Sequence, residues 1–203
     1  MNRGSQGGGP RSGGDGTADF RSDGPDSAQA AEEGPAVCLL DRLGVPWRLV
    51  RHPAIGTVEE GLDAGVADLL GIAACDLSKC LLLEDAGGAL VLVVAPALVR
   101  PDLKAVRLVA GTRRLHLAPP DRLRGSLGSV PGSVSLFDLI CHPGTVTTVV
   151  LEEGLVLGRG ETALHAGTNR ASILIPKRCL PMVADSLCGN VVTWRVGGDA
   201  DRP

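Results

Sequence analysis

Hydrophobic and polar positions follow two periods along the chain, one typical of strands and one typical of helices. Residues 77–84 and 89–95 are apolar runs separated by Asp85-Ala-Gly-Gly88, which predicts a β-hairpin. From Thr57 to Gly71 the apolar residues recur at helical spacing, and Thr57 with Glu60 resembles a capping box. Further helices are predicted at 36–43, 102–110, 119–127 and 176–187, and further strands at 47–51, 113–117, 145–151, 163–165, 171–175 and 191–196.

The order of these elements predicts the fold class. Strands and helices are mixed without strict βαβ alternation, so we expect a single α+β domain with a mixed, curved sheet flanked by helices. Residues 1–34 are mostly Gly, Ser, Asp and Ala, and we predict a disordered tail there because they offer too little apolar surface to bury. The folded domain is expected at 35–198, with Pro35 starting its first helix. Deleting residues 1–34 should then leave activity unchanged.

The composition limits the core and the charge limits the partners. Aromatic residues make up 2% of the 203 residues, which excludes a platform that stacks single-stranded nucleic acid and predicts an aliphatic core. Residues 1–34 hold three basic and six acidic side chains, which accounts for the whole net charge of -3. Residues 100–124 hold seven basic and two acidic side chains. This segment is either a solvated face or the place where an RNA backbone docks.

Apolar runs and cysteines indicate the compartment. We find no run long enough to span a membrane and no signal peptide, so we expect a cytoplasmic protein. The six cysteines are then expected to be core residues or free thiols in a reducing environment. Cys75 and Cys80 with Cys141-His142 offer a weak metal pattern, but zinc ligands are usually spaced more tightly. We therefore expect neither metal nor cofactor.

Lys79 is the first candidate for chemistry, since the chain has only three lysines against 17 arginines. On the predicted strand it shares a face with Leu81 and Leu83, and Cys80 points to the other face. A partly buried ammonium needs an anionic or polar partner. The alternative is a lysine at a strand end whose head group reaches solvent.

Two polar loops are further candidates. The loop that contains Gly132, Ser133, Val134 and Ser135 can present backbone N–H groups to a carbonyl oxygen or a phosphate, or it can simply connect two elements. His165 and Asn169 bracket a tight turn in the motif His-Ala-Gly-Thr-Asn. They can face one ligand together, or the Asn side chain can bond to the backbone of its own turn.

Taken in chain order, these segments resemble the YbaK/ProX family of aminoacyl-tRNA editing domains, and most closely its free-standing branch. The resemblance rests on Leu-Gly-Val-Pro at 43–46, Arg-His-Pro at 51–53, Thr-Val-Glu-Glu at 57–60, Ser-Lys-Cys-Leu-Leu-Leu-Glu-Asp at 78–85, Asp-Leu-Lys-Ala at 102–105, Pro-Gly-Ser-Val-Ser-Leu-Phe at 131–137, and His165 with Asn169. It implies the family's α+β fold and a trans-acting deacylase. Such an enzyme hydrolyses the ester of a small amino acid, such as alanine on the proline tRNA, without a metal.

The resemblance also implies roles for residues. Lys79 falls on the family's key lysine, which orients the acylated adenosine and supports the developing oxyanion. The loop residues Gly132, Ser133, Val134 and Ser135 fall on its backbone-binding loop. The pocket motif is carried by His165 and Asn169. The implied partner is the acceptor end of a mischarged tRNA, not DNA or a membrane, and the backbone contacts are expected from Arg100, Lys104, Arg107, Arg113 and Arg114.

Four places depart from the family pattern, and two other functions stay open. Cys80, Leu136 and Ala166 stand where the family has Asn, Pro and Pro, and Cys141-His142 stands where it has polar residues of the Asn-Asp type. A non-catalytic protein that keeps the fold and binds a tRNA end or a small molecule is one alternative. A thiol-dependent enzyme that uses Cys80 or Cys141 is the other, although neither cysteine has an evident catalytic partner in the sequence.

Overall fold

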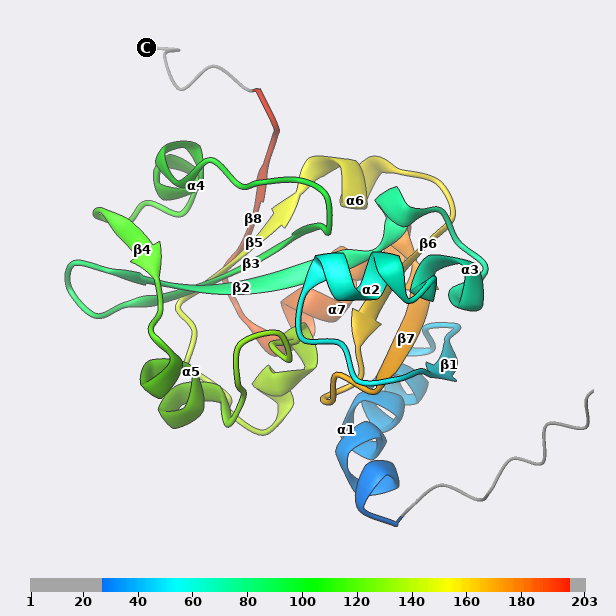
Figure 1. The fold of residues 1–203 in the computed structure, drawn as a ribbon. Coiled ribbons are helices and arrows are strands. Elements are labelled where there is room, and N and C mark those ends of the chain that lie inside the picture. The colour runs from blue at the N-terminus through cyan, green and yellow to red at the C-terminus, as the bar shows by residue number, and fades with distance from the viewer. Residues whose placement is uncertain (1–26, 198–203) are drawn as a thin grey trace, which may run out of the picture.

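The computed structural model describes residues 27–197, in which eight strands form two sheets (Figure 1). The smaller sheet is antiparallel, in the order β1-β7-β6. Its strands are β1 (Arg48–Arg51), β6 (Glu161–His165) and β7 (Ala171–Pro176). The predicted pairing of 163–165 with 171–175 around the Ala166–Thr168 turn is confirmed.

The larger sheet is mixed, in the order β4-β2-β3-β5-β8. Strand β2 runs antiparallel to β3 and β4, whereas β5 runs parallel to β3 and β8. Its strands are β2 (Ser78–Asp85), β3 (Leu90–Pro96), β4 (Leu115–Leu117), β5 (Thr148–Glu152) and β8 (Val191–Trp194). The α+β class, the mixed sheet and the hairpin are as predicted, and the second sheet is an addition to the prediction.

Helices cover the faces and ends of the sheets (Figure 1). They are α1 (Ser27–Leu43), α2 (Val58–Asp63), α3 (Val66–Leu70), α4 (Leu103–Val109), α5 (Pro120–Leu127), α6 (Glu153–Leu157) and α7 (Leu180–Leu187), with 3₁₀ turns η1 (Ala74–Asp76), η2 (Leu136–Ile140) and η3 (Lys177–Cys179). The predicted helix from Thr57 to Gly71 is divided in two, because Gly65 adopts φ +65°. The Thr57 cap is confirmed, since its hydroxyl accepts from the Glu60 N–H at 3.1 Å. Within 27–197, no helix is both long and apolar enough to cross a membrane.

The core is almost entirely aliphatic, as the composition predicted. Strand β3 is buried on both faces, so its alternate residues enter different clusters. Leu92 and Val94 belong to the cluster that α1 and α7 cover, whereas Val91 and Val93 belong to the cluster under α4. A third, smaller cluster includes Val66 and Leu70 of α3 and Leu174 of β7. These packed layers fix the relative positions of the strands that carry the candidate site.

The N-terminal boundary differs from the prediction. Helix α1 begins at Ser27 and contains Pro35 in its interior, so residues 27–34 belong to the folded body. Glu33 reads as a solvated tail residue in the sequence, yet it is 3% exposed and forms a two-point ion pair with Arg51. A partner 18 residues away therefore decides the burial of Glu33. The rest of the predicted tail, residues 1–26, lies outside the described residues.

Truncation should show that residues 27–34 and residues 1–26 contribute differently to stability. Deleting residues 1–34 removes Glu33 and two turns of α1, so Arg51 loses a charge-assisted hydrogen-bond partner. We expect the free energy of unfolding to fall by roughly 1–3 kcal/mol, measured by urea denaturation. Deleting residues 1–26 is the matched control and should leave the midpoint unchanged. Equal stability of the two truncated proteins would contradict a structural role for 27–34.

Candidate active site

The two sheets meet at one backbone junction. Leu77, just before β2, forms an isolated parallel bridge with Ala163 of β6. The Ser78 hydroxyl donates to the Ala163 carbonyl at 2.5 Å, and the Thr162 hydroxyl donates to the Asp76 carbonyl at 2.9 Å. Segments far apart in the chain are therefore joined by backbone and short side chains at this point.

A partly buried ion pair secures the same junction. Lys177 of η3 is 7% exposed, and its Nζ lies 2.6 Å from Asp76 Oδ1. An ammonium this deeply buried is tolerated only when it is paired. The pair therefore ties η3, which follows β7, to η1, which precedes β2.

A cavity of about 280 Å³ lies at the junction. Its walls come from β2, β6, β7, the segment before α2 and the loop around Gly132. Most of the lining is aliphatic. The polar side chains in it, apart from Cys80, belong to Thr57, Ser78, Lys79, His165 and Ser172. Lys79, Gly132, Val134 and His165 were predicted as site residues, and the structure brings these four together.

Lys79 lies in the wall with its ammonium group partly buried. Its Nζ donates to the Ala97 carbonyl at 2.8 Å. Burial lowers the pKa of Lys79, and the Glu59 carboxylate opposes part of that shift. The predicted alternation along β2 is confirmed, because Leu81 and Leu83 pack in one core cluster and Cys80 packs against another.

The loop at Gly132 approaches the segment before α2 through backbone alone. Gly132 has φ +86°, and a Cβ placed there would lie 2.1 Å from the Gly56 carbonyl oxygen. Both the positive φ and this contact exclude a side chain at position 132. The two glycines and Val134 line the cavity, so this contact forms part of its wall.

Two other predicted loop residues hold the loop instead of facing the cavity. The Ser133 hydroxyl donates to the Val130 carbonyl at 2.9 Å, within its own loop. The Ser135 hydroxyl donates to the His165 carbonyl at 2.5 Å and accepts from the Phe137 N–H at 3.2 Å as the cap of η2. Neither serine lines the cavity, so both support the site indirectly.

The predicted pair His165 and Asn169 is divided in the same way. The imidazole of His165 lines the cavity, and burial together with His52 lowers its pKa to about 4, so the ring is neutral near pH 7. Asn169 does not line the cavity. Its side-chain amide donates to the Ile55 carbonyl at 2.9 Å, and its own carbonyl accepts from the Ile55 N–H at 3.1 Å. It bonds to a distant wall segment, not to its own turn.

Ser172 is a cavity residue that the sequence did not single out. Its Oγ lies 3.0 Å from Nε2 of His52, which the sequence offered only as part of the Arg-His-Pro motif at 51–53. The one signal for Ser172 is a lone hydroxyl within the apolar run 171–176. Nothing local in the sequence connects it with His52, 120 residues away.

The structure bears on the Cys80 form of the thiol alternative and on the metal pattern. Burial raises the pKa of Cys80 to about 12, with the charge of Asp138 adding to the rise, so this side chain remains a protonated thiol. A thiol in that state is a poor nucleophile. Over residues 27–197, the His, Cys, Asp and Glu side chains form no group of three or more that could hold a metal ion.

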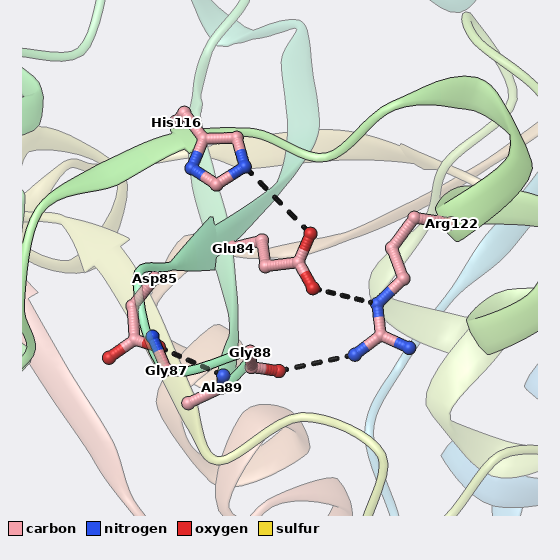
Figure 2. Close-up of polar contacts among 7 residues, drawn as sticks. All are labelled: Glu84, Asp85, Gly87, Gly88, Ala89, His116 and Arg122. Carbon is pink, nitrogen blue, oxygen red and sulfur yellow. Dashed lines mark hydrogen bonds and ion pairs between the residues drawn. The ribbon is translucent and has the colours of Figure 1, made fainter.

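The basic segment contains both paired and unpaired cations. Figure 2 shows Arg122 between the Glu84 carboxylate, at 3.0 Å, and the Gly88 carbonyl, at 3.1 Å. Arg124 pairs with Asp121 at 3.6 Å. The five other cations are exposed and have no carboxylate within 4.0 Å among the described residues; they are Arg100, Lys104, Arg107, Arg113 and Arg114.

A second hollow joins this segment to the cavity. Its volume is about 540 Å³, and its lining combines Lys79 and Leu81 with Arg100, Asp102 and Leu117. Because both hollows include Lys79 and Leu81, they adjoin each other at these two side chains. A cation of the basic segment therefore lines a depression that begins at the cavity wall.

Comparisons with known proteins identify the class. The model of the aminoacyl-tRNA editing domain family matches residues 52–180. The chain is 31% identical over 140 residues to Prolyl-tRNA editing protein ProX of Acetoanaerobium sticklandii, an alignment that covers 68% of this chain and 82% of that protein. This chain belongs to the aminoacyl-tRNA editing domain family. The expected YbaK/ProX family, and with it the class of aminoacyl-ester hydrolases, is confirmed.

Solved structures show the same fold. One, described as a candidate trans-editing enzyme for prolyl-tRNA synthetase, superposes with a TM-score of 0.62 at 23% identity and covers 82% of this chain and 98% of its own. Another, the hypothetical protein APE2540, has a TM-score of 0.63 at 23% identity and covers 78% of this chain and 97% of its own. At these identities the likeness establishes the fold alone, and it confirms the predicted α+β architecture.

The glycine contact at the cavity wall can be tested with a matched pair of variants. Gly132→Ala places a methyl group against the Gly56 carbonyl, whereas Gly88→Ala has the same φ of +86° with nothing within 4 Å. The Gly88 variant should lose about 1–2 kcal/mol of stability from backbone conformation alone. The Gly132 variant should lose clearly more in the same thermal denaturation experiment. Equal losses of stability in the two variants would show that the loop can move to accommodate the methyl group at no energetic cost.

Proposed function

We propose that this protein is a trans-acting deacylase that removes a small amino acid, such as alanine, from a mischarged proline tRNA. The observation that carries the proposal is the position of Lys79. Its side chain lies in the wall shared by the cavity and the hollow that contains Arg100. An amino acid in the cavity and a nucleotide in the hollow would place their connecting ester beside this cation.

The reaction is hydrolysis of an activated ester, so positioning and charge stabilisation can supply most of the catalysis. Water adds to the ester carbonyl, the tetrahedral intermediate expels the ribose oxygen, and the products are a free amino acid and a tRNA with its terminal hydroxyl restored. In this proposal Lys79 orients the acylated adenosine and stabilises the developing oxyanion. Its partial burial strengthens that interaction, because water screens it less.

The remaining site residues bind the substrate. The backbone around Gly132 and Val134 faces the cavity and is proposed to hold the aminoacyl carbonyl. Neutral His165 contributes one wall. Ser133, Ser135 and Asn169 act by fixing the loop and the opposite segment through the bonds described above.

Selectivity for a small amino acid is proposed to come from the shape of the cavity wall. The cavity of about 280 Å³ is bounded by aliphatic side chains such as Ile55, Val66 and Ala163. Because that volume exceeds the size of an alanyl side chain, selection requires these side chains to overlap a larger amino acid once the ester is held at Lys79, as in double-sieve editing. Cys80 and Leu81 share the wall near Lys79, so their side chains also limit the space available to the ester.

Docking of the tRNA is assigned to the basic segment. The five unpaired cations Arg100, Lys104, Arg107, Arg113 and Arg114 are exposed, and Arg100 lines the hollow next to Lys79. Phosphate neutralisation by such side chains dominates the affinity of most nucleic-acid complexes. The body of the protein therefore needs no net positive charge to bind an acceptor end.

Replacing Lys79 tests the enzyme directly. Lys79→Ala should lower deacylation of alanine from the proline tRNA by about 10²- to 10³-fold, because it removes the main oxyanion-stabilising group. Circular dichroism and thermal denaturation should show an unchanged fold. The measurement is the release of labelled amino acid from a panel of mischarged tRNAs under single-turnover conditions. Lys79→Arg, which keeps the charge but changes its shape, should recover only part of the rate.

The same panel distinguishes the competing functions. A wild-type protein that deacylates no member of the panel but binds tRNA ends would be a non-catalytic binding protein. Inactivation by thiol alkylation with Lys79→Ala fully active would favour the cysteine mechanism. Either result would reject the proposed function.

The basic segment makes a separate prediction about salt. Removing one cation that contacts a phosphate should reduce the slope of log affinity against log salt by about 0.7–0.9. We expect this for Arg100→Ala and Arg107→Ala, measured as tRNA affinity between low and moderate salt. Arg124→Ala is the matched control from the same segment, because Arg124 already pairs with Asp121. The assignment fails if all three variants keep the wild-type slope.

A further inference from the structure

The proposed function leaves one buried polar pair at the cavity unused. Ser172 on β7 lies opposite His165 on β6 in the sheet register, and it lines the cavity. Its Oγ is 3.0 Å from His52 Nε2, and His52 Nδ1 is 2.9 Å from the Pro53 carbonyl. Ser172 is 5% exposed and His52 is 8% exposed, so both belong to the interior.

The Pro53 carbonyl fixes which atom donates in each of these hydrogen bonds. A carbonyl oxygen can only accept, so His52 Nδ1 must carry the proton that faces Pro53. In the neutral ring Nε2 is then an acceptor, and the Ser172 hydroxyl donates to it. Because the only proton of Ser172 is used in this way, its hydroxyl has only lone pairs left to offer a ligand in the cavity.

The charges around the cavity show what such an acceptor is suited to bind. No carboxylate is present among the described side chains that line the cavity, and Lys79 is its only cationic side chain. The α-amino group of an aminoacyl ester is a donor that needs acceptors, and it is best placed away from an ammonium. Neutral His165, opposite Ser172, adds no repulsion.

The other hydroxyls of the cavity are less suited to this role. The Thr57 hydroxyl already accepts from the Glu60 N–H as the cap of α2. Ser78 is the chain neighbour of Lys79 on β2, the strand that carries the cation. Ser172 comes from the smaller sheet, on the side of the junction that does not carry Lys79.

We propose that Ser172 binds the α-amino group of the aminoacyl moiety, and that His52 is a positioning residue that fixes the Ser172 hydroxyl as an acceptor. The inference rests on the proposed deacylase function and deepens it. It divides the substrate between two sheets, with the ester at Lys79 on the larger sheet and the amino group at Ser172 on the smaller one. The site would then recognise aminoacyl esters in preference to acyl esters that lack the amino group.

The test compares two substrates that differ only in that group. Alanyl-tRNA and propionyl-tRNA are hydrolysed by the full-length wild-type protein, Ser172→Ala and Ser172→Thr. Ser172→Ala should lower kcat/KM for the alanyl ester by about 10- to 100-fold, mainly through KM, since a hydrogen bond to a charged group is lost. For the propionyl ester the loss should stay within about threefold. Ser172→Thr keeps the hydroxyl and should retain the preference.

Three control variants separate binding from structure. Ser78→Ala removes another hydroxyl of the cavity and should affect both esters equally. His52→Gln keeps an acceptor near the position of Nε2 and should retain the preference, whereas His52→Leu should lose it. Thermal denaturation of each variant shows whether it folds. An equal loss on both esters for Ser172→Ala, or a loss of preference in Ser78→Ala instead, would overturn the assignment.

Binding of uncleavable analogues makes the inference independent of turnover. Alanyl and propionyl amides of 3′-amino-3′-deoxyadenosine replace the ester with an amide, and their affinities are measured by calorimetry. Preference for the alanyl amide that disappears in Ser172→Ala supports the assignment, even if wild type hydrolyses no ester and the deacylase proposal fails. Equal affinity of wild type for the two amides would overturn the assignment while leaving deacylation to be judged by Lys79→Ala.

Discussion

The joint between the two sheets is the constraint on which the site depends. The Leu77–Ala163 bridge and the partly buried Lys177–Asp76 pair hold the start of β2 against β6 and the end of β7. Residues separated by about half the chain are thereby placed around one cavity. Removing the Asp76 carboxylate would leave the buried Lys177 ammonium without a partner, which is strongly unfavourable. The chain therefore keeps its two sheets in one relative position.

Burial around that joint also sets the chemistry that the cavity can perform. Desolvation lowers the pKa values of Lys79 and His165 and raises the pKa of Cys80. The result is a cation beside a neutral imidazole and a protonated thiol. Such a set stabilises developing negative charge and does not offer a strong nucleophile, which agrees with hydrolysis by positioned water.

Local patterns in the sequence predicted the elements, and long-range contacts decided the details of the site. The hairpin, the Thr57 cap and the face of Lys79 follow from spacing, because each depends on near neighbours. The start of α1 depends on Glu33 meeting Arg51, and the position of Ser172 depends on its pairing with His52. The periodic spacing of hydrophobic residues carries no information about such distant pairs. The family could be identified from the order of its motifs, because several motifs that are each weak become specific when they occur in the same order along the chain.

The contact between Gly132 and Gly56 has a consequence for how this site can diverge. That part of the wall is formed by main chain against main chain, so it has no side chain that a point mutation could shorten. Other parts of the wall are formed by replaceable aliphatic side chains such as Ile55 and Val66. Relatives built on the same contact could exchange one small substrate for another by changing those side chains while the backbone part of the wall stayed the same.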